Sequence, residues 1–345
     1  MPATRTIAAR VYARRSGARI KAMRFSTPPT LTASAGTAIR MSLSGRFERD
    51  DEIDYVNDML EPVLIINGRE YPLGVYMIGT LIRTYGASSV EDEIEAYDQC
   101  LLLQQTRLEA RLHLAKGEPY TKCITRLLIM AGITRTEITT TSATLTTDRE
   151  DWDVGADFLT IINELLDEIN YEHIWFNFAG AAVIQPKRDA DIDNPTVRYS
   201  ADAYSILQTG GTSTVDSYDA PNVFIATVPN PDYDGQITAT AVNDNPSSAL
   251  STVRRGRRIV KAMQLSNTAS QAELQKYVND ICMKSMYASE KITFATAVNA
   301  NHQIDEVVEL RSKNVTGVYL ETGWSMELAA GGTMRHDAER MIYSL

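Results

Sequence analysis

The sequence predicts an α+β protein that is mostly β, with a small helix-containing block between two β-rich blocks. Three observations carry this prediction: alternating apolar and polar residues early in the chain, helical apolar spacing in the middle, and renewed strand-like runs towards the end. We place the three blocks at residues 1–112, 113–195 and 196–345. A chain of 345 residues fits two or three domains at ~100–200 residues each.

The first block is predicted to consist of strands. Thr37–Phe47 contains apolar residues at every second position, the period of a half-buried strand. Pro62–Ile66 and Leu73–Ile78 flank Asn67-Gly68, the dipeptide that best tolerates the two positive φ values of a type I′ turn. The sequence therefore predicts a hairpin at this point.

The middle block carries the helical patterns. Cys123–Ala131 has apolar residues at helical spacing, and Gly132 stands where a left-handed C-terminal residue is common. Phe158–Ile169 follows the i, i+3, i+4, i+7 pattern of an amphipathic helix. A short hairpin is expected over His173–Gln185, turning at Ala179-Gly180. We expect its aromatic side chains to close the core of this block: Trp175, Phe176 and Phe178.

The third block begins after the polar stretch Lys187–Pro195, which is a plausible domain boundary. Val223–Val228 and Gln236–Val242 are predicted strands, and a helix is expected to start at Ser270 with Glu273 completing a capping box. The apolar face of that helix is predicted to comprise Leu274, Tyr277, Val278, Ile281 and Cys282. The closing strands are predicted around Val307–Leu310 and Val318–Leu328.

The composition is that of an ordinary soluble globular protein with a net charge of -10. Its longest uncharged apolar stretches, such as Leu127–Ala131, fall far below the ~18 residues of a membrane helix, so no membrane span is expected. Three widely spaced cysteines argue against a disulfide framework and for assembly in a reducing cytosol. Residues 1–24 carry seven basic residues and no acid, which leaves -17 on the rest of the chain.

No nucleotide or zinc motif is present. Gly-x-Gly-x-x-Gly and Walker loops are absent, and Gly210-Gly211 and Gly331-Gly332 are interpreted as turns. The four histidines are scattered along the chain without the clustered Cys and His ligands typical of zinc. These are His113, His173, His302 and His336. We therefore predict neither a cofactor nor a metal.

The acidic residues form no recognisable calcium-binding or catalytic motif either. Asp189, Asp191 and Asp193 open like an EF-hand loop, but Asn194 stands at the sixth position in place of glycine. A solvated acidic loop is the simpler interpretation, also for Asp232 and Asp234. The remaining carboxylates are expected on exposed helix faces and loops, and no Gly-x-Ser-x-Gly elbow occurs. No catalytic residue is predicted.

Two basic clusters remain as candidate interaction sites. One lies in residues 1–24, and the other lies between residues 254 and 261. Basic segments can neutralise phosphates, but stacking aromatics are missing between the charges, so contact with an acidic partner surface is at least as good an interpretation. The residues proposed for a subunit interface are Arg10, Arg14, Arg15, Arg254, Arg255, Arg257 and Arg258.

Several segments, in order, resemble the Tal-like (tail-associated) baseplate hub proteins of phage tails. The resemblance extends over most of residues 35–345 and is weaker before residue 35. It is carried by Glu95–Leu103, Gly117–Tyr120, Leu127–Ile133, Leu159–Tyr171, Gly180–Pro186, Ala220–Val223, Asn245–Ser251, Arg254–Arg257, Asp305–Leu310, Gly317–Tyr319 and Ser325–His336.

The resemblance implies two tube-type β-barrel or sandwich domains with a small α/β domain between them. It implies a homotrimeric ring at the tail tip of the virion that continues the tail tube channel and adapts a sixfold tube to a threefold tip. Implied partners are the distal tail protein or tail tube hexamer, the tape measure protein and a tip, spike or fibre protein, with DNA only in transit. Assembly is expected in the host bacterial cytoplasm.

The resemblance implies no enzyme, cofactor or catalytic residue, and we expect a hub only, with receptor binding and lysis on other chains. Head-to-tail rings need two different complementary patches, which the opposite charges of residues 1–24 and of the remaining chain would supply. Two alternatives stay open: a tail-associated cell-wall hydrolase whose carboxylates converge only in the fold, and a DNA-binding tail component.

Overall fold

The computed structural model confirms a mostly β protein of the α+β class, with 48% strand and 14% helix. It describes residues 5–87, 89–169, 171–186, 194–202, 205–215, 220–230, 235–264, 271–284 and 288–342, and no sheet closes into a barrel within these ranges. The chain divides into two compact units. Unit 1 comprises Met1–Gln208, Ala295–Thr316 and Glu321–His336, and unit 2 comprises Thr209–Phe294, Gly317–Leu320 and Asp337–Leu345.

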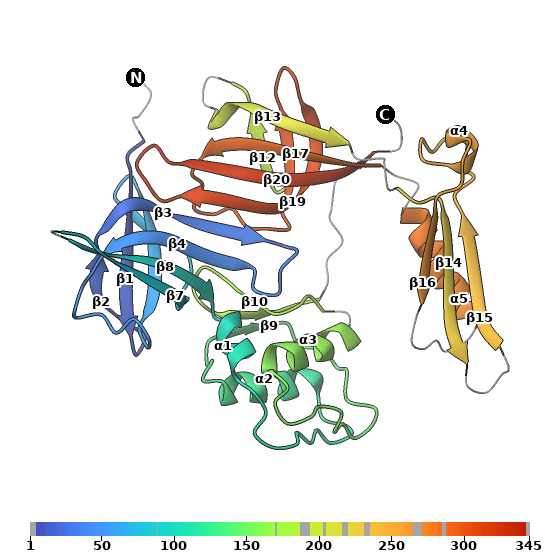
Figure 1. The fold of residues 1–345 in the computed structure, drawn as a ribbon, viewed down its shortest axis with the longest axis horizontal. Coiled ribbons are helices and arrows are strands. Elements are labelled where there is room, and N and C mark those ends of the chain that lie inside the picture. Colours follow the sequence, from blue (N-terminus) through green and yellow to red (C-terminus); the bar gives the residue numbers. More distant parts are fainter. Residues whose placement is uncertain are drawn as a thin grey trace. The chain divides into compact units, whose positions relative to one another are not determined.

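Unit 1 is built on a large sheet whose strands run in the order β19-β3-β4-β8-β7-β5-β1-β2 (Figure 1). Its strands are β1 (Ile7–Arg15), β2 (Ala18–Met23), β3 (Phe25–Ser34), β4 (Met41–Glu48), β5 (Met59–Ile66), β6 (Arg69–Pro72), β7 (Tyr76–Tyr85), β8 (Val90–Asp98), β12 (Val197–Ser200) and β18 (Val307–Arg311). The strand predicted over Thr37–Phe47 is confirmed as β4, which buries Met41, Leu43 and Phe47.

The sheet joins the two ends of the sequence. β19 (Thr316–Glu327) pairs antiparallel with β3, so that Trp324 lies opposite Ala33. Trp324 is 2% exposed and belongs to one core with Leu31 and Leu43. Late strands therefore complete the core of the first β block.

The Asn67-Gly68 turn is confirmed, because Asn67 has a φ of 51° and Gly68 has a φ of 79°, both positive as a type I′ turn requires. The predicted partner strand is wrong: it is β6, which starts at Arg69 directly after the turn, rather than Leu73–Ile78. A two-residue turn fixes the register at once, so the next residues must pair. Part of Leu73–Ile78 instead opens β7, where Met77 pairs with Met59.

The helices of unit 1 pack around a second core. They are α1 (Cys100–Gln105), α2 (Tyr120–Met130) and α3 (Phe158–Glu168), beside a small sheet of β9 (Thr136–Ile138), β10 (Trp175–Phe176) and β11 (Ala182–Ile184). Both predicted helices are confirmed, and Gly132 has a φ of 81° after α2. Asp157 caps α3 by accepting a hydrogen bond from the Thr160 amide. Phe176 joins this core, whereas Phe178 packs against the β core with its ring 6.5 Å from that of Trp324, which corrects its predicted place.

Unit 2 contains a three-stranded sheet covered by a helix. Its elements are β14 (Val223–Asn230), β15 (Gly235–Val242), α4 (Thr252–Arg255), β16 (Val260–Gln264) and α5 (Gln271–Lys284). The predicted strands are confirmed, and Leu274, Val278 and Cys282 of α5 are buried. Tyr277 is 42% exposed, so its predicted burial is wrong.

A ladder of β13 (Leu207–Val215), β17 (Ala288–Ala297) and β20 (Thr333–Ile342) completes the sheets. Gly210-Gly211 lies inside β13, so the predicted turn is wrong there: a Cβ on Gly211 would stand 2.6 Å from the Thr293 carbonyl oxygen, a close approach that only glycine permits. Gly331-Gly332 does form the turn between β19 and β20.

Several predicted features fall outside the described residues. These are Ser270 of the capping box, most of the Lys187–Pro195 boundary, the acidic residues Asp189, Asp191 and Asp193, and the pair Asp232 and Asp234. Among the helices that are described, none is both long and apolar enough to cross a membrane.

Candidate functional site

The N-terminal cluster (Arg5, Arg10, Arg14, Arg15, Arg19, Lys21 and Arg24) lies on or beside the β1–β2 hairpin. Val11 and Ala13 of β1 are buried in the core. Because side chains alternate along a strand, Arg10, Tyr12 and Arg14 project from the opposite face. β1 pairs antiparallel with β5, which places Tyr12 directly opposite Glu61. The hairpin thus lays its basic residues over an acidic part of the sheet.

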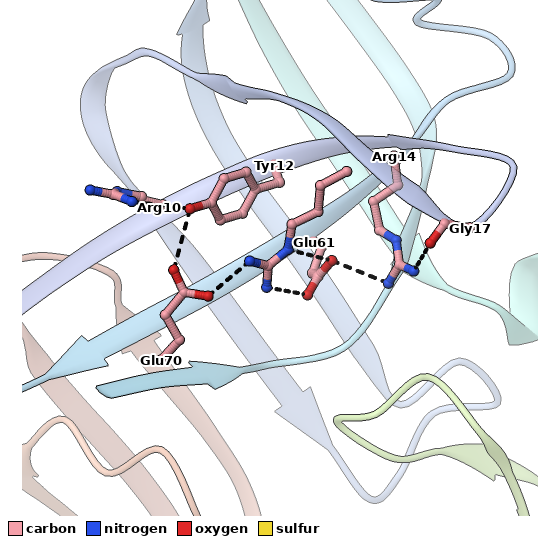
Figure 2. Close-up of polar contacts among 7 residues, drawn as sticks. Arg10, Tyr12, Arg14, Gly17, Glu61 and Glu70 are labelled. Carbon is pink, nitrogen blue, oxygen red and sulfur yellow. Dashed lines mark hydrogen bonds and ion pairs between the residues drawn. The ribbon is translucent and has the colours of Figure 1, made fainter. Parts of the chain in front are cut away.

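Glu61 is the centre of this network. Its carboxylate is 8% exposed and contacts Arg14 at 3.1 Å and Arg19 at 2.7 Å. Arg19 also reaches Glu70 at 2.8 Å, and its guanidinium lies 4.3 Å from the centre of the Tyr12 ring. Figure 2 shows the contact of Arg14 with Glu61 together with the bond from Arg14 to the Gly17 carbonyl oxygen. Arg14 and Arg19 are therefore neutralised within the chain.

The acidic residues before and within β5 engage the rest of the hairpin. Arg15 donates two hydrogen bonds to Asp58, at 2.7 and 2.8 Å, which lower the pKa of that buried carboxyl despite its burial. Lys21 contacts Asp50 at 2.8 Å and Glu52 at 3.3 Å. The prediction that the acidic residues are merely solvated is wrong for these groups, because the sheet brings basic strands onto them.

Other buried carboxylates also have structural partners. Arg83 binds Asp92 in a two-point contact, with distances of 2.7 and 3.0 Å. Asp98 accepts hydrogen bonds from the backbone amides of Met41 and Cys100, and burial raises its pKa. These carboxylates hold strands and a helix start in place, which is a structural use.

Arg10 differs from its neighbours. Its guanidinium donates to the Tyr12 hydroxyl at 3.1 Å, and that contact raises its pKa. No carboxylate in the described residues forms an ion pair with Arg10. Of the three predicted interface residues in the N-terminal cluster, Arg10 is thus the one with charge left for a partner.

The α4 cluster (Arg254, Arg255, Arg257, Arg258 and Lys261) is built differently. The Ser251 hydroxyl caps the four-residue helix α4 by accepting from the Arg254 amide, and Gly256 ends it with a φ of 61°. Arg255 donates to the Ala220 carbonyl oxygen at 2.9 Å, and its burial, with a smaller effect of Arg257, lowers its pKa. The exposed members are Arg254, Arg257, Arg258 and Lys261.

No ion pair joins Arg254, Arg257 or Arg258 to an acidic residue within the described ranges. The two basic clusters belong to different compact units. The sequence could not distinguish a paired cluster from an unpaired one, because the acids that pair with the N-terminal cluster come from strands that meet it only in the sheet. The unpaired α4 cluster is the stronger candidate for an intermolecular contact.

The histidines are not all scattered in space. His302 and His336 lie with ring centres 4.9 Å apart, and Glu321 lies beside both. Their sequence positions alone gave no sign of this pair, since β20 and the β17–β18 connection that carry them meet only in the fold. His113 and His173 instead pair with surface carboxylates, Glu150 and Asp167.

The cysteines are free thiols. Cys100, Cys123 and Cys282 are buried, and burial raises the pKa of Cys123 to about 11. A protonated buried thiol is a poor nucleophile. The prediction that Cys123 and Cys282 lie on buried helix faces is confirmed.

The fold has clear counterparts among solved structures. A tail protein from Neisseria meningitidis MC58 matches with a TM-score of 0.67 and 13% identity, covering 96% of this chain and 97% of that one. The 43 kDa tail protein of prophage MuSo2 from Shewanella oneidensis also matches with a TM-score of 0.67, at 10% identity and 97% and 99% coverage. The Listeria monocytogenes prophage tail protein gp18 follows with a TM-score of 0.56 and 10% identity, covering 96% and 94%.

These matches define the class of the protein by its architecture. The chain shares its fold with these tail proteins over 96–97% of its length, and the predicted resemblance to phage tail proteins is confirmed at this level. No family model matches the chain, and no curated protein matches it either. The identification therefore rests on the fold.

Proposed function

We propose that this protein is a structural hub of a phage tail tip or baseplate. The observation that carries the proposal is the match along almost the whole length of two tail proteins, at a TM-score of 0.67 each. In the proposed assembly three chains form a ring that continues the tail tube channel and adapts a sixfold tube to a threefold tip. The three predicted blocks, 1–112, 113–195 and 196–345, are its proposed domains.

The proposed partners follow from that position. Above the ring we place the tail tube hexamer or distal tail protein, and below it a tip, spike or fibre protein. The tape measure protein ends at the ring, and DNA passes through only in transit. The protein would be located at the tail tip of the virion after assembly in the host cytoplasm, and it would have no catalytic activity. The buried carboxylates support this last point, because they hold strands together.

The ring contact is proposed to use exposed basic residues against an acidic surface of the neighbouring subunit. A closed ring with head-to-tail contacts requires two different surfaces on each subunit. Arg254, Arg257 and Arg258 fit one of them, since they are exposed and unpaired within the described residues. Arg10 is the corresponding candidate in unit 1.

The decisive experiment is a native mass measurement of the purified chain. A mass three times the 38.3 kDa of the chain is expected, and a strictly monomeric protein at micromolar concentration would contradict the ring. Negative-stain images of virions labelled against this chain should show label at the tail tip. Labelling along the tail tube or on the head would contradict the proposed location.

Two assays separate the alternatives from the hub. Release of fragments from purified cell walls by this chain would favour the hydrolase. Binding of DNA that weakens steeply with salt would favour a DNA-binding component, because such binding rests on counterion release. The hub predicts neither result.

A further inference from the structure

A compact group of ionisable side chains lies buried inside unit 1, apart from both basic clusters. His302 belongs to the connection between β17 and β18, Glu321 lies on β19 and His336 lies on β20. All three side chains are 0% exposed. One potential ligand atom from each of the three residues lies within 4.8 Å of the other two. Three segments separated in sequence therefore point polar atoms at one place.

Glu321 stands between the two imidazole rings. One carboxylate oxygen lies 3.0 Å from Nδ1 of His336, and the other lies 3.3 Å from Nε2 of His302. Two ligands bound to a tetrahedral zinc ion at ~2.0–2.1 Å stand about 3.3 Å from each other. The two distances to Glu321 are thus close to those between atoms that share a metal ion, and all three ligand atoms lie within 4.8 Å of one another.

Each histidine has a second polar neighbour on its other nitrogen. Nε2 of His336 is bonded to the Thr296 hydroxyl at 2.9 Å, and Nδ1 of His302 lies 2.8 Å from Glu306. Metal-binding histidines commonly present the second nitrogen to a carboxylate or another polar oxygen, which fixes the ring. Thr296 and Glu306 occupy those positions.

The group is also incompletely bonded by protein atoms alone. Both ring nitrogens of His302, one oxygen of Glu306 and one oxygen of Glu321 are buried without an aligned hydrogen bond. Buried polar atoms normally have partners, and unpaired ones require an explanation. A cation held between the three side chains would provide it for His302 and Glu321.

The electrostatics favour a positive charge here. Glu306 and Glu321 place two carboxylates within 2.8 and 3.3 Å of the two ring nitrogens of His302. The Tyr199 ring, centred 6.2 Å from His302 and 5.5 Å from His336, covers both imidazoles. In this buried setting a divalent cation would compensate the charges of both carboxylates.

We propose that His302, Glu321 and His336 form a binding site for a divalent transition-metal ion of the zinc class. Two imidazoles and one carboxylate are ligands that suit zinc. Glu306 and Thr296 act as positioning residues on the two histidines. The ion would tie β19, β20 and the β17–β18 connection together, a structural role independent of whether the chain assembles into a ring.

The first test is the metal content of the full chain after incubation with Zn²⁺ and removal of unbound metal. About one zinc per folded chain is expected, because the three side chains form a single site. H302Q, H336Q and E321Q should each lose it, while H173Q, which changes an exposed histidine, should keep it. A folded wild-type chain that retains no zinc, or full retention in H302Q and H336Q, would overturn the proposal.

The second test does not require the ligand variants to fold. Co²⁺ added to the wild-type chain should give the visible absorption bands of a protein-bound ion, and Zn²⁺ should displace them. E306Q should weaken zinc binding about 10–100-fold and alter the cobalt bands, whereas E150Q, beside the exposed His113, should change neither. Absence of cobalt bands, or an E306Q protein identical to wild type in both measurements, would contradict the assignment.

Discussion

The N-terminal cluster and the α4 cluster are both runs of basic residues, but they differ in whether acidic residues of the chain pair with them. In the N-terminal cluster, five basic side chains form ion pairs with acidic residues of the same unit, and Glu61 alone serves two of them. In the α4 cluster, Arg254, Arg257 and Arg258 are exposed and have no such partner in the described residues. Within the described residues, the α4 cluster therefore keeps most of its charge unpaired, whereas Arg10 is the predicted interface residue of the N-terminal cluster that has no acidic partner.

The cause of the difference is topological. β1 lies against β5, whose acidic residue Glu61 faces the same side of the sheet as Arg14. The α4 cluster begins on a single helical turn that ends at Gly256, and within the described residues no acidic side chain forms an ion pair with Arg254, Arg257 or Arg258. A run of basic residues is therefore weak support for an interface until the fold reveals which of its charges are already paired.

Because Arg14 and Arg15 are already paired within the chain, a test of the N-terminal residues requires a variant that leaves those pairs intact. Reversing Arg10, Arg14 and Arg15 together would test the interface predicted from sequence. However, glutamate at positions 14 and 15 would face the buried carboxylates of Glu61 and Asp58, and repulsion would destabilise the hairpin. Loss of assembly in that variant would then report on folding. Arg10→Glu alone avoids this difficulty.

The largest effect on stability is expected from Glu61→Gln. The substitution leaves Arg14, which is 19% exposed, and Arg19, which is 36% exposed, without their shared and nearly buried counterion, so we expect the free energy of unfolding to fall by about 2–4 kcal/mol. Urea unfolding followed by circular dichroism measures it. Glu70→Gln is the matched control, because Glu70 is 38% exposed and its loss should cost less than about 1 kcal/mol. Equal losses would contradict the central role of Glu61.

The second-largest effect is expected at acid pH, which should weaken the ion pairs of the N-terminal cluster. Arg15 holds the pKa of Asp58 below its ordinary value of 3.8. A carboxyl with a lowered pKa in the folded state contributes stability above its unfolded pKa, and this is lost as pH falls through the folded pKa. Stability should therefore decline from about pH 4 downwards. Asp58→Asn should be less stable at pH 7, and the difference from wild type should shrink as the pH falls through the folded pKa of Asp58, which lies below 3.8; parallel pH curves for the two proteins would refute this.

Elements that depend only on residues close in sequence could be predicted from the sequence. The Asn67-Gly68 turn and the α3 pattern depend on neighbours within a few residues, and both are confirmed. The turn predicted at Gly210-Gly211 is wrong because the requirement for glycine comes from Thr293, a distant residue on the adjacent strand. Local pattern contains no information on which strands become neighbours.

The candidate sites show the same limit. The pairing of Arg14 with Glu61 depends on the β1–β5 register, and the meeting of His302 with His336 depends on how β20 and the β17–β18 connection converge. Neither follows from spacing along the chain. The resemblance to phage tail proteins is confirmed at the level of fold, although the matched structures are only 13% and 10% identical to this chain.

A smaller change in stability is expected from reversing the α4 cluster. Arg254→Glu, Arg257→Glu and Arg258→Glu remove no ion pair within the described residues, so the free energy of unfolding should shift by no more than about 0.5 kcal/mol per site. Assembly should nevertheless be lost, as measured by native mass. Reversal of Lys116, Lys122 and Lys313, which are also exposed, controls for total charge and should leave the oligomer intact. Normal assembly of the α4 variant would remove that cluster from the interface.

Salt is expected to change the stability of the folded chain least, yet it should distinguish the paired N-terminal cluster from the unpaired α4 cluster. Raising ionic strength from 0.15 to 1 M shortens the screening length from about 8 to about 3 Å, which weakens contacts between exposed charges most. Glu61 is shielded from solvent and lies 2.7 Å from Arg19, so unfolding of the single chain should change little. Dissociation of the oligomer should increase strongly, because the α4 charges must attract a neighbour across solvent. Size-exclusion chromatography with light scattering measures this, and an oligomer that is insensitive to salt would indicate an interface held by apolar surface instead.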